Sequence, residues 1–318
     1  MCGLFGFSTY GHDPIRDPSK LTNSLALQSS VRGTDATGIA FIHAGKVNVQ
    51  KEALPAHKLT FKPPSEIKAL IGHTRHSTQG SEKKNYNNHP FTGKVPGARF
   101  ALAHNGVLTN DDLLRIQLNL PKTKIETDSY VAVQLIELKR SLTFASLRYM
   151  AEQVQGSFSF SILGDDDSIY LVKGDSPLSL IHFPHHKTYV YASTDEILYR
   201  ALIDTPLFEA VKSKDYQAIP ITCGTILRIR PDGHMETDSF HYSTYRGMGW
   251  WDFGDYSYGT RASQGEKSAT DPEREAYIEN LKLFAYYEGV MPEIVDELLN
   301  EGFTLNEIEE YIYEYSCC

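Results

Sequence analysis

The second residue of the chain is a cysteine, and its position suggests a specific chemistry. Cys2 is small enough to permit removal of Met1, which would leave Cys2 with a free α-amine. Such an amine has an ordinary pKa of about 7.7–8.0, so a useful fraction is unprotonated at neutral pH. It can act as general base for its own thiol, directly or through one water. One residue would then supply both nucleophile and base.

A nucleophile of this kind also needs donors for the oxyanion that forms on its substrate. His104-Asn105-Gly106 follows an apolar stretch. The side-chain amide of Asn105 and the backbone N–H of Gly106 are suitable donors, each with a typical contribution of about 2.7–4 kcal/mol. An ordinary Asn-Gly turn is the alternative interpretation.

Two charged residues suit the recognition of an amino acid. Arg75 ends an apolar stretch, and an arginine fork matches a carboxylate bidentately. Asp128 opens a helical pattern, where it could cap the helix or accept an ammonium group. Taken singly, a surface arginine and a capping aspartate explain these residues. Together beside a thiol they indicate a zwitterionic amino-acid substrate.

The elements that must position these residues alternate between short apolar runs and helical patterns. Strands are predicted at 1–8, 39–43, 69–73, 99–103, 157–163, 169–173, 178–182, 189–193 and 225–229. Helices are predicted at 20–31, 128–139, 147–154 and 196–203. This order indicates two sheets covered by helices rather than regular βαβ repeats.

The C-terminal part of the chain has a different composition. Residues 236–270 include an aromatic, glycine-rich stretch and a polar connector, and residues 271–318 predict an acidic three-helix tail with helices at 271–288, 292–300 and 304–315. The whole chain has a formal charge of −9, while the tail holds thirteen acidic and two basic residues, so the rest is close to neutral. The tail could dock a basic partner or simply be solvated.

Composition also excludes several classes of function. Nothing approaches a run of about 18 apolar residues, so no membrane span is predicted. A near-neutral body with an acidic tail disfavours nucleic-acid binding. The four cysteines, Cys2, Cys223, Cys317 and Cys318, form neither a disulfide framework nor a zinc pattern. The chain is predicted to be cytoplasmic and to need no metal and no cofactor.

Six short motifs occur in an order that resembles a known family. They are Cys2-Gly3-Leu4-Phe5-Gly6, Arg32-Gly33-Thr34-Asp35-Ala36-Thr37-Gly38, Gly72-His73-Thr74-Arg75-His76-Ser77-Thr78-Gln79-Gly80, Asn88-His89-Pro90-Phe91, His104-Asn105-Gly106 and Thr127-Asp128. Over roughly residues 2–230 the chain resembles the class II glutamine amidotransferase domain, the glutaminase module of glucosamine-6-phosphate synthase and glutamine phosphoribosylpyrophosphate amidotransferase.

The resemblance implies an α+β fold, a four-layer αββα N-terminal-nucleophile hydrolase sandwich with a small C-terminal helical appendage. It implies the following roles for residues of this chain. Cys2 is the nucleophile, Asn105 and Gly106 form the oxyanion hole, Arg75, Asp128, Thr78 and His89 bind substrate, and Arg32 and Asp35 brace the site. The chain departs from the family at His76, where an aromatic residue is common, and at Ala36, where serine is common.

The implied activity is glutamine hydrolysis through a thioester, with ammonia delivered to a synthase supplied in trans. The domains are predicted as 1–235 for the glutaminase, 236–270 for the linker and 271–318 for the tail. Residues 1–318 contain no Gly-x-x-x-x-Gly-Lys phosphate loop that an acceptor domain could use. Two alternatives stay open: a stand-alone hydrolase of another γ-glutamyl amide, and a glutamine-sensing pseudoenzyme that recruits a partner.

Overall fold

The structure of the chain is a computed structural model. It describes residues 2–11, 15, 17–203, 205–242, 278–279, 281–282, 285–286, 290–303, 305, 308 and 311–312. These residues fall into two compact units, Met1–Tyr245 and Arg246–Cys318. Met1 and most of the predicted linker lie outside the described residues.

The first unit contains a seven-stranded sheet, called sheet A here, with β1 near its centre. Its strands pair antiparallel in the order β11-β9-β10-β1-β4-β2-β3. Their bounds are Gln217–Ile219, Ser179–Phe183, Thr188–Ala192, Gly3–Thr9, Ala69–Arg75, Ala36–His43 and Lys46–Glu52, in that order.

A six-stranded sheet, sheet B, faces it. The order is β13-β12-β8-β7-β6-β5, again antiparallel throughout. The bounds are Met235–Ser239, Thr225–Ile229, Ile169–Lys173, Gly156–Gly164, Ala98–Leu108 and Phe91–Val95.

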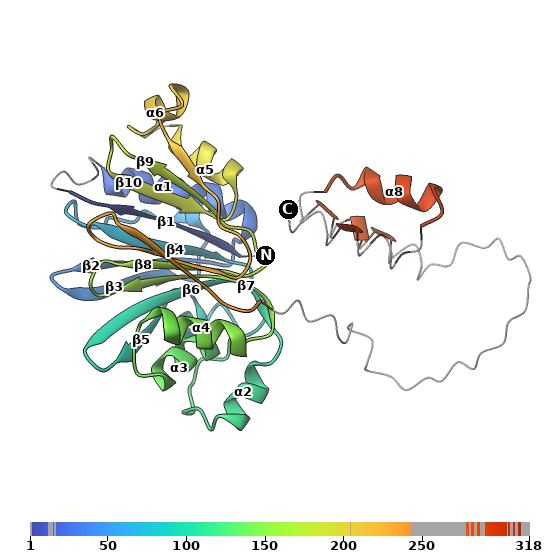
Figure 1. Ribbon diagram of the computed structural model, residues 1–318, viewed down its shortest axis with the longest axis horizontal. Coiled ribbons are helices and arrows are strands. Elements are labelled where there is room, and N and C mark those ends of the chain that lie inside the picture. Colours follow the sequence, from blue (N-terminus) through green and yellow to red (C-terminus); the bar gives the residue numbers. More distant parts are fainter. Residues whose placement is uncertain are drawn as a thin grey trace, which may run out of the picture. The chain divides into compact units, whose positions relative to one another are not determined.

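Helices cover the outer face of each sheet (Figure 1). Sheet A is covered by α1 (Pro18–Ser29), α5 (Asp195–Leu202) and α6 (Phe208–Lys212), and sheet B by α2 (Asp111–Gln117), α3 (Tyr130–Leu138) and α4 (Phe144–Gln153). Short 3-10 turns, η1 to η3, lie at Ser30–Arg32, Ala56–Lys58 and Asn85–Asn87.

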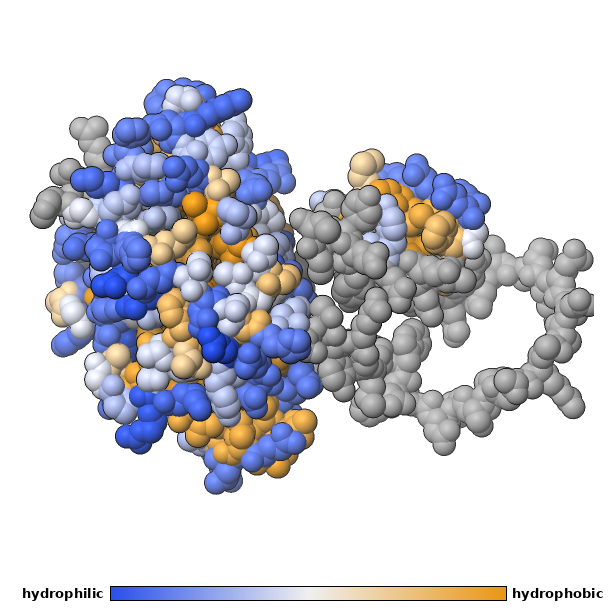
Figure 2. Space-filling view, viewed as in Figure 1, coloured by the Kyte–Doolittle hydropathy of each residue, from blue (hydrophilic) through white to orange (hydrophobic). Residues whose placement is uncertain are grey.

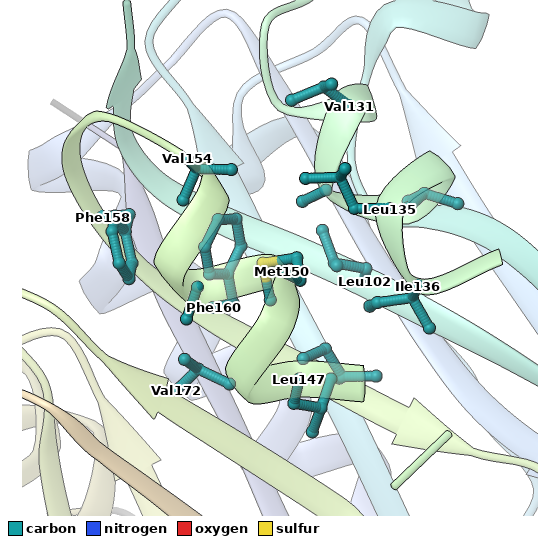
Figure 3. Close-up of a cluster of buried hydrophobic side chains, with 14 of the residues drawn as sticks. Leu102, Val131, Leu135, Ile136, Leu147, Met150, Val154, Phe158, Phe160 and Val172 are labelled. Carbon is teal, nitrogen blue, oxygen red and sulfur yellow. The ribbon is translucent and has the colours of Figure 1, made fainter. Parts of the chain in front are cut away.

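Strand alternation divides the apolar side chains among three layers of core. On β1, Phe5 and Phe7 pack toward the helices while Leu4 packs between the sheets, as the period of two in a strand requires. Figure 3 shows the outer core of sheet B, where Leu135 of α3 and Met150 of α4 pack onto strand residues. The four-layer αββα sandwich is therefore confirmed.

The predicted strands at 39–43, 69–73 and 99–103 correspond to β2, β4 and β6, each longer than predicted. The predicted helix at 128–139 corresponds to α3, which starts at Tyr130. The edge strands β3 and β5, and the helix α2 after β6, had no counterpart in the sequence prediction. No helix among the described residues has the length and apolarity to cross a membrane.

The second unit has a small apolar core of its own. It includes α8 (Glu293–Asn300), and helical residues are described on either side of it, such as Leu281 and Ile312. The buried side chains are Leu281, Ala285, Val290, Val295, Leu298, Ile308 and Ile312. The three-part division of the chain stays a prediction.

Candidate active site

Cys2 directly precedes β1, which lies between β4 and β10 inside sheet A. Its side chain is buried, with 9% exposed. The backbone N–H of His76 donates to the sulfur at 3.4 Å, and the thiol donates to the carbonyl oxygen of His76 at 3.5 Å. Burial raises the pKa of the Cys2 thiol, which the His76 N–H only partly offsets. The thiol therefore depends on a base to ionise it.

The segment after α1 holds Cys2 and the loop that follows β4. Arg32 Nε donates to the carbonyl oxygen of Cys2 at 2.8 Å. Asp35 accepts from the Ser77 N–H at 2.7 Å and donates its own N–H to the Arg75 carbonyl at 3.0 Å. Gly33 permits this approach, because a Cβ there would lie 2.4 Å from the Arg75 carbonyl carbon. Arg32 and Asp35 thus fasten the two segments together.

Arg75, at the end of β4, is buried and donates hydrogen bonds to the loop that follows it and to Asn88. Its Nη2 donates to the carbonyl oxygens of Gln79 at 2.7 Å and Gly80 at 2.8 Å. Its Nη1 donates to Asn88 Oδ1 at 2.7 Å. Asn88 in turn donates to the Glu82 carbonyl at 2.8 Å. The guanidinium therefore holds the loop of residues 76–80 against Asn88.

Asn105 and Gly106 lie within β6, which continues past them to Leu108 rather than ending before them. Neither the amide oxygen nor the amide nitrogen of Asn105 has a hydrogen-bond partner among the described residues, although its side chain is only 1% exposed. Gly106 has φ +136°, and a Cβ there would lie 2.0 Å from the Ser157 carbonyl oxygen. Only glycine fits this position.

Asp128 lies beside the end of β6. Its Oδ2 accepts from the Leu108 N–H at 2.6 Å, and its Oδ1 accepts from the Ser129 hydroxyl at 3.2 Å. The Ser129 oxygen is also 2.8 Å from Nδ1 of His104. The carboxylate is thus oriented by a strand and by a neighbouring hydroxyl.

Three buried histidines lie next to this arrangement. His73 Nε2–H donates to the His104 carbonyl at 2.9 Å, which joins β4 to β6 across the sheets. The ring of His89 lies 4.1 Å from that of His73, and neither of its nitrogens has a partner among the described residues. Burial lowers the pKa of all three, that of His73 to about 3. They are neutral at ordinary pH.

One small pocket brings most of the predicted residues together. Cys2, Arg75, Thr78, His89, Gly106 and Asp128 all line it, along with His76, Gln79, His104, Thr127 and Ser129. Its volume is about 10 Å³, room for roughly one water molecule. The unpartnered atoms of His89, together with Thr127 Oγ1, belong to this lining. Buried polar groups without partners are costly, so this pocket suits a polar ligand.

Two residues at this site were missed in the sequence prediction. Asn88 lies inside a quoted motif but carries no reactive group, and Ser129 follows Asp128 directly.

Among the described residues no group of histidines, cysteines or carboxylates could hold a metal ion. A larger cavity of about 660 Å³ lies apart from the thiol, between β3 and β5.

Comparison with known proteins gives a consistent result. No family model matches the chain. Glutamine–fructose-6-phosphate aminotransferase (isomerizing) from Halalkalibacterium halodurans is 31% identical over 186 residues, 56% of this chain and 30% of the relative. The same enzyme from Chlamydia trachomatis is 32% identical over 189 residues, 57% of this chain and 30% of the relative. The chain thus spans under a third of the length of these relatives.

Solved structures share the fold. Glutamine phosphoribosylpyrophosphate amidotransferase from B. subtilis superposes with a TM-score of 0.58 at 23% identity, over 76% of this chain and 50% of that chain. Its similarity supports the αββα sandwich alone, whereas the aminotransferases support the relationship in sequence. The sequence matches and the shared fold together confirm the resemblance to the class II glutamine amidotransferase domain.

Proposed function

We propose that Cys2, once Met1 is removed, hydrolyses the side-chain amide of glutamine. The observation that supports this most directly is the pocket beside the buried thiol, where Arg75 and Asp128 lie together and buried polar atoms have no partner. An arginine and an aspartate recognise the carboxylate and ammonium of an amino acid. The pocket's unpartnered donors suit the rest of such a ligand.

The proposed reaction begins with transfer of the thiol proton to the α-amine of Cys2. The sulfur attacks the amide carbon, and the oxyanion accepts hydrogen bonds from Asn105 Nδ2 and the Gly106 N–H. Collapse breaks the C–N bond, and the Cys2 ammonium returns its proton to the leaving ammonia. Water, deprotonated by the same amine, then cleaves the γ-glutamyl thioester and releases glutamate.

Glutamine does not fit a volume of about 10 Å³, so the pocket must widen to admit it. The loop of residues 76–80 is the part that moves in this proposal, because it covers the thiol and is held mainly through Arg75 and Asp35. Thr78 and His89 are proposed to contact the substrate from the pocket wall.

We further propose that ammonia passes to a synthase supplied in trans, in the cytoplasm, where Cys2 stays reduced. The support is that the matched region covers 30% of relatives whose names describe transfer to fructose-6-phosphate. Turnover without the partner is then expected to be slow and to rise when the partner binds.

The test is glutamine-dependent glutamate release, with intact mass measured on the same sample. Loss of Met1 and release that disappears in Cys2→Ala but persists in Cys223→Ala are expected. Cys223 is the matched control because it is an exposed cysteine that does not line the pocket. A processed chain that hydrolyses other γ-glutamyl amides but not glutamine would overturn the substrate assignment.

A further inference from the structure

Lys51 interrupts the apolar face of β3. Val47 and Val49 pack against the core between the two sheets, and Lys51 is the next residue on that face of the strand. Its ammonium lies 5.1 Å from the centre of the Phe91 ring, and no carboxylate among the described residues forms an ion pair with it. Burial, and after it the charge of Arg75, lower the pKa of Lys51 to about 8. Burying a cation without a counter-ion costs free energy, so the groups that this ammonium does bind are informative.

The ammonium binds the backbone on both sides of His89. Lys51 Nζ donates to the carbonyl oxygens of Asn88 and, at 3.1 Å, Pro90. Gly38 of β2, which pairs directly with Lys51, leaves room for this segment. A Cβ at Gly38 would lie 2.2 Å from the His89 carbonyl oxygen, so the segment passes closely over the glycine. One cation therefore fixes residues 88–90 on sheet A.

The segment of residues 88–90 carries two groups of the candidate active site. The Asn88 side chain is buried, and its Oδ1 accepts from Arg75 Nη1 at 2.7 Å. The ring of His89 lines the pocket beside the thiol. Arg75 also donates to two carbonyl oxygens of the loop of residues 76–80, which links its position to that of the loop. Lys51 does not line the pocket, so it can affect a substrate only through the residues that it holds.

The other bonds of Asn88 join it to its own turn. Its Nδ2 donates to the Glu82 carbonyl at 2.8 Å and to Asn85 Oδ1 at 3.1 Å, and these partners can move together with Asn88. The turn is tied to β3 by the Lys51 ammonium and by a bond of 2.7 Å from Asn85 Nδ2 to the Lys51 carbonyl. The ammonium makes the stronger contact, because its bonds are charge-assisted and partly buried whereas the Asn85 bond is exposed.

We propose that Lys51 is a positioning residue, whose ammonium fixes residues 88–90 on sheet A and thereby sets the position of Arg75 through Asn88. The effect on Arg75 and its loop stands by itself, while the effect on glutamine affinity rests on the proposed glutaminase function. A buried cation outside the pocket would thus determine how well the pocket holds the substrate carboxylate.

The first test is amide hydrogen exchange of the full chain, read by mass spectrometry without any ligand. Lys51→Met keeps the length of the side chain but removes its charge and its donors. Residues 76–91 should then exchange about tenfold faster, because the loop and the turn are less firmly held. Lys51→Arg keeps a cation that can donate to both carbonyl oxygens, so it should restore slow exchange. Lys46→Met is the matched control, because Lys46 is an exposed lysine on the same strand.

Unchanged exchange of residues 76–91 in Lys51→Met would overturn the proposal. So would exchange that rises equally throughout sheet B, because this would show a general loss of stability.

The second test is steady-state kinetics with glutamine. Lys51→Met should raise KM about tenfold with kcat nearly unchanged, whereas a loss of folded enzyme would lower kcat at an unchanged KM. In a chain that already carries Asn88→Ala, adding Lys51→Met should raise KM no further, because the Oδ1 that positions Arg75 is gone. Additive rises in KM would overturn the route through Asn88. Faster exchange of residues 76–91 in a chain that never hydrolyses glutamine would support the positioning role and overturn only the glutaminase function and the effect on KM.

Discussion

At the scale of single residues, Asn105 makes the clearest prediction. Its amide is buried without a partner among the described residues, while Gly106 beside it lines the pocket. If the amide donates its hydrogen bond only to the oxyanion, it stabilises the transition state and not the bound substrate. Asn105→Ala should then lower kcat about 10²–10³-fold with little change in KM. Steady-state kinetics decide this, and a kcat within about threefold of the unaltered enzyme would remove Asn105 from the oxyanion hole.

Asn88 makes a different prediction, because it acts through Arg75. Among the described residues its Oδ1 is the only side-chain acceptor that hydrogen-bonds Arg75, and the other acceptors are loop carbonyls. Asn88→Ala should therefore raise KM for glutamine about tenfold with kcat nearly unchanged. Asn87→Ala is the matched control, since Asn87 is equally buried in the same turn but bonds Glu126 and Ser81 instead. Equal effects of the two substitutions would show a merely structural role.

The contrast between these residues explains what sequence reasoning could find. Cys2, Arg75 and Asp128, which line one pocket, were predicted because a thiol, a guanidinium and a carboxylate have chemistry of their own. Asn88 and Ser129 act by orienting a charged neighbour, and that neighbour is identified only once the chain is folded. Their amide and hydroxyl groups are too common in sequences to indicate a role.

At the scale of elements, the two sheets are joined by a buried pair of hydroxyl groups. Tyr191 Oη on β10 lies 2.5 Å from Ser161 Oγ on β7, and both side chains are fully buried. Tyr191→Phe leaves Ser161 without this partner and should cost about 1–3 kcal/mol of unfolding free energy. Ser161→Ala should cost a similar amount for the same reason. The double variant should cost less than the two single costs together, measured by urea unfolding. Strict additivity would show that the pair contributes no coupling.

The edge strands β3 and β5, which the sequence did not predict, share a physical character. β3 (Lys46–Glu52) has Val47 and Val49 among lysine, asparagine and glutamine, because an edge strand buries only part of its surface. β5 is five residues long and contains Gly93. A Cβ at this position would lie 2.2 Å from the Phe100 ring, so glycine makes room for that ring. The central strands β1, β4 and β7 each contain several apolar residues, and they were predicted. Sequence patterns thus located the core but not the two edges that border the cavity between β3 and β5.

At the scale of the whole molecule, exposed apolar side chains are unevenly distributed over the surface of the sandwich. Figure 2 shows apolar side chains gathered on the surface over α2, where Leu113 is 51% and Ile116 79% exposed. α2 follows β6, so this surface begins a few residues after Gly106. The cavity between β3 and β5 is a second feature of this unit's surface, and hydrogen bonds through Asn85 and Asn88 link it to Arg75.

The two sheets also enclose His73, His89 and His104, which predicts how stability depends on pH. Burial lowers their pKa values in the folded protein, and Arg75 adds to this at His73 and His89, whereas unfolded histidine titrates near about 6.5. Below about pH 6.5 the unfolded chain binds protons that the folded chain does not. The stability they contribute is therefore present above that pH and lost as pH falls.

For each histidine that stays neutral in the folded state, the unfolding free energy should fall by about 1.4 kcal/mol per pH unit once the pH is well below 6.5. Urea unfolding at pH 7.5, 6.5 and 5.5 measures the slope. His89→Leu should reduce the slope by about one proton, because neither ring nitrogen of His89 has a partner whose loss would confuse the comparison. Equal slopes in the two proteins would mean that His89 accepts a proton inside the fold, and that water reaches the space between the sheets.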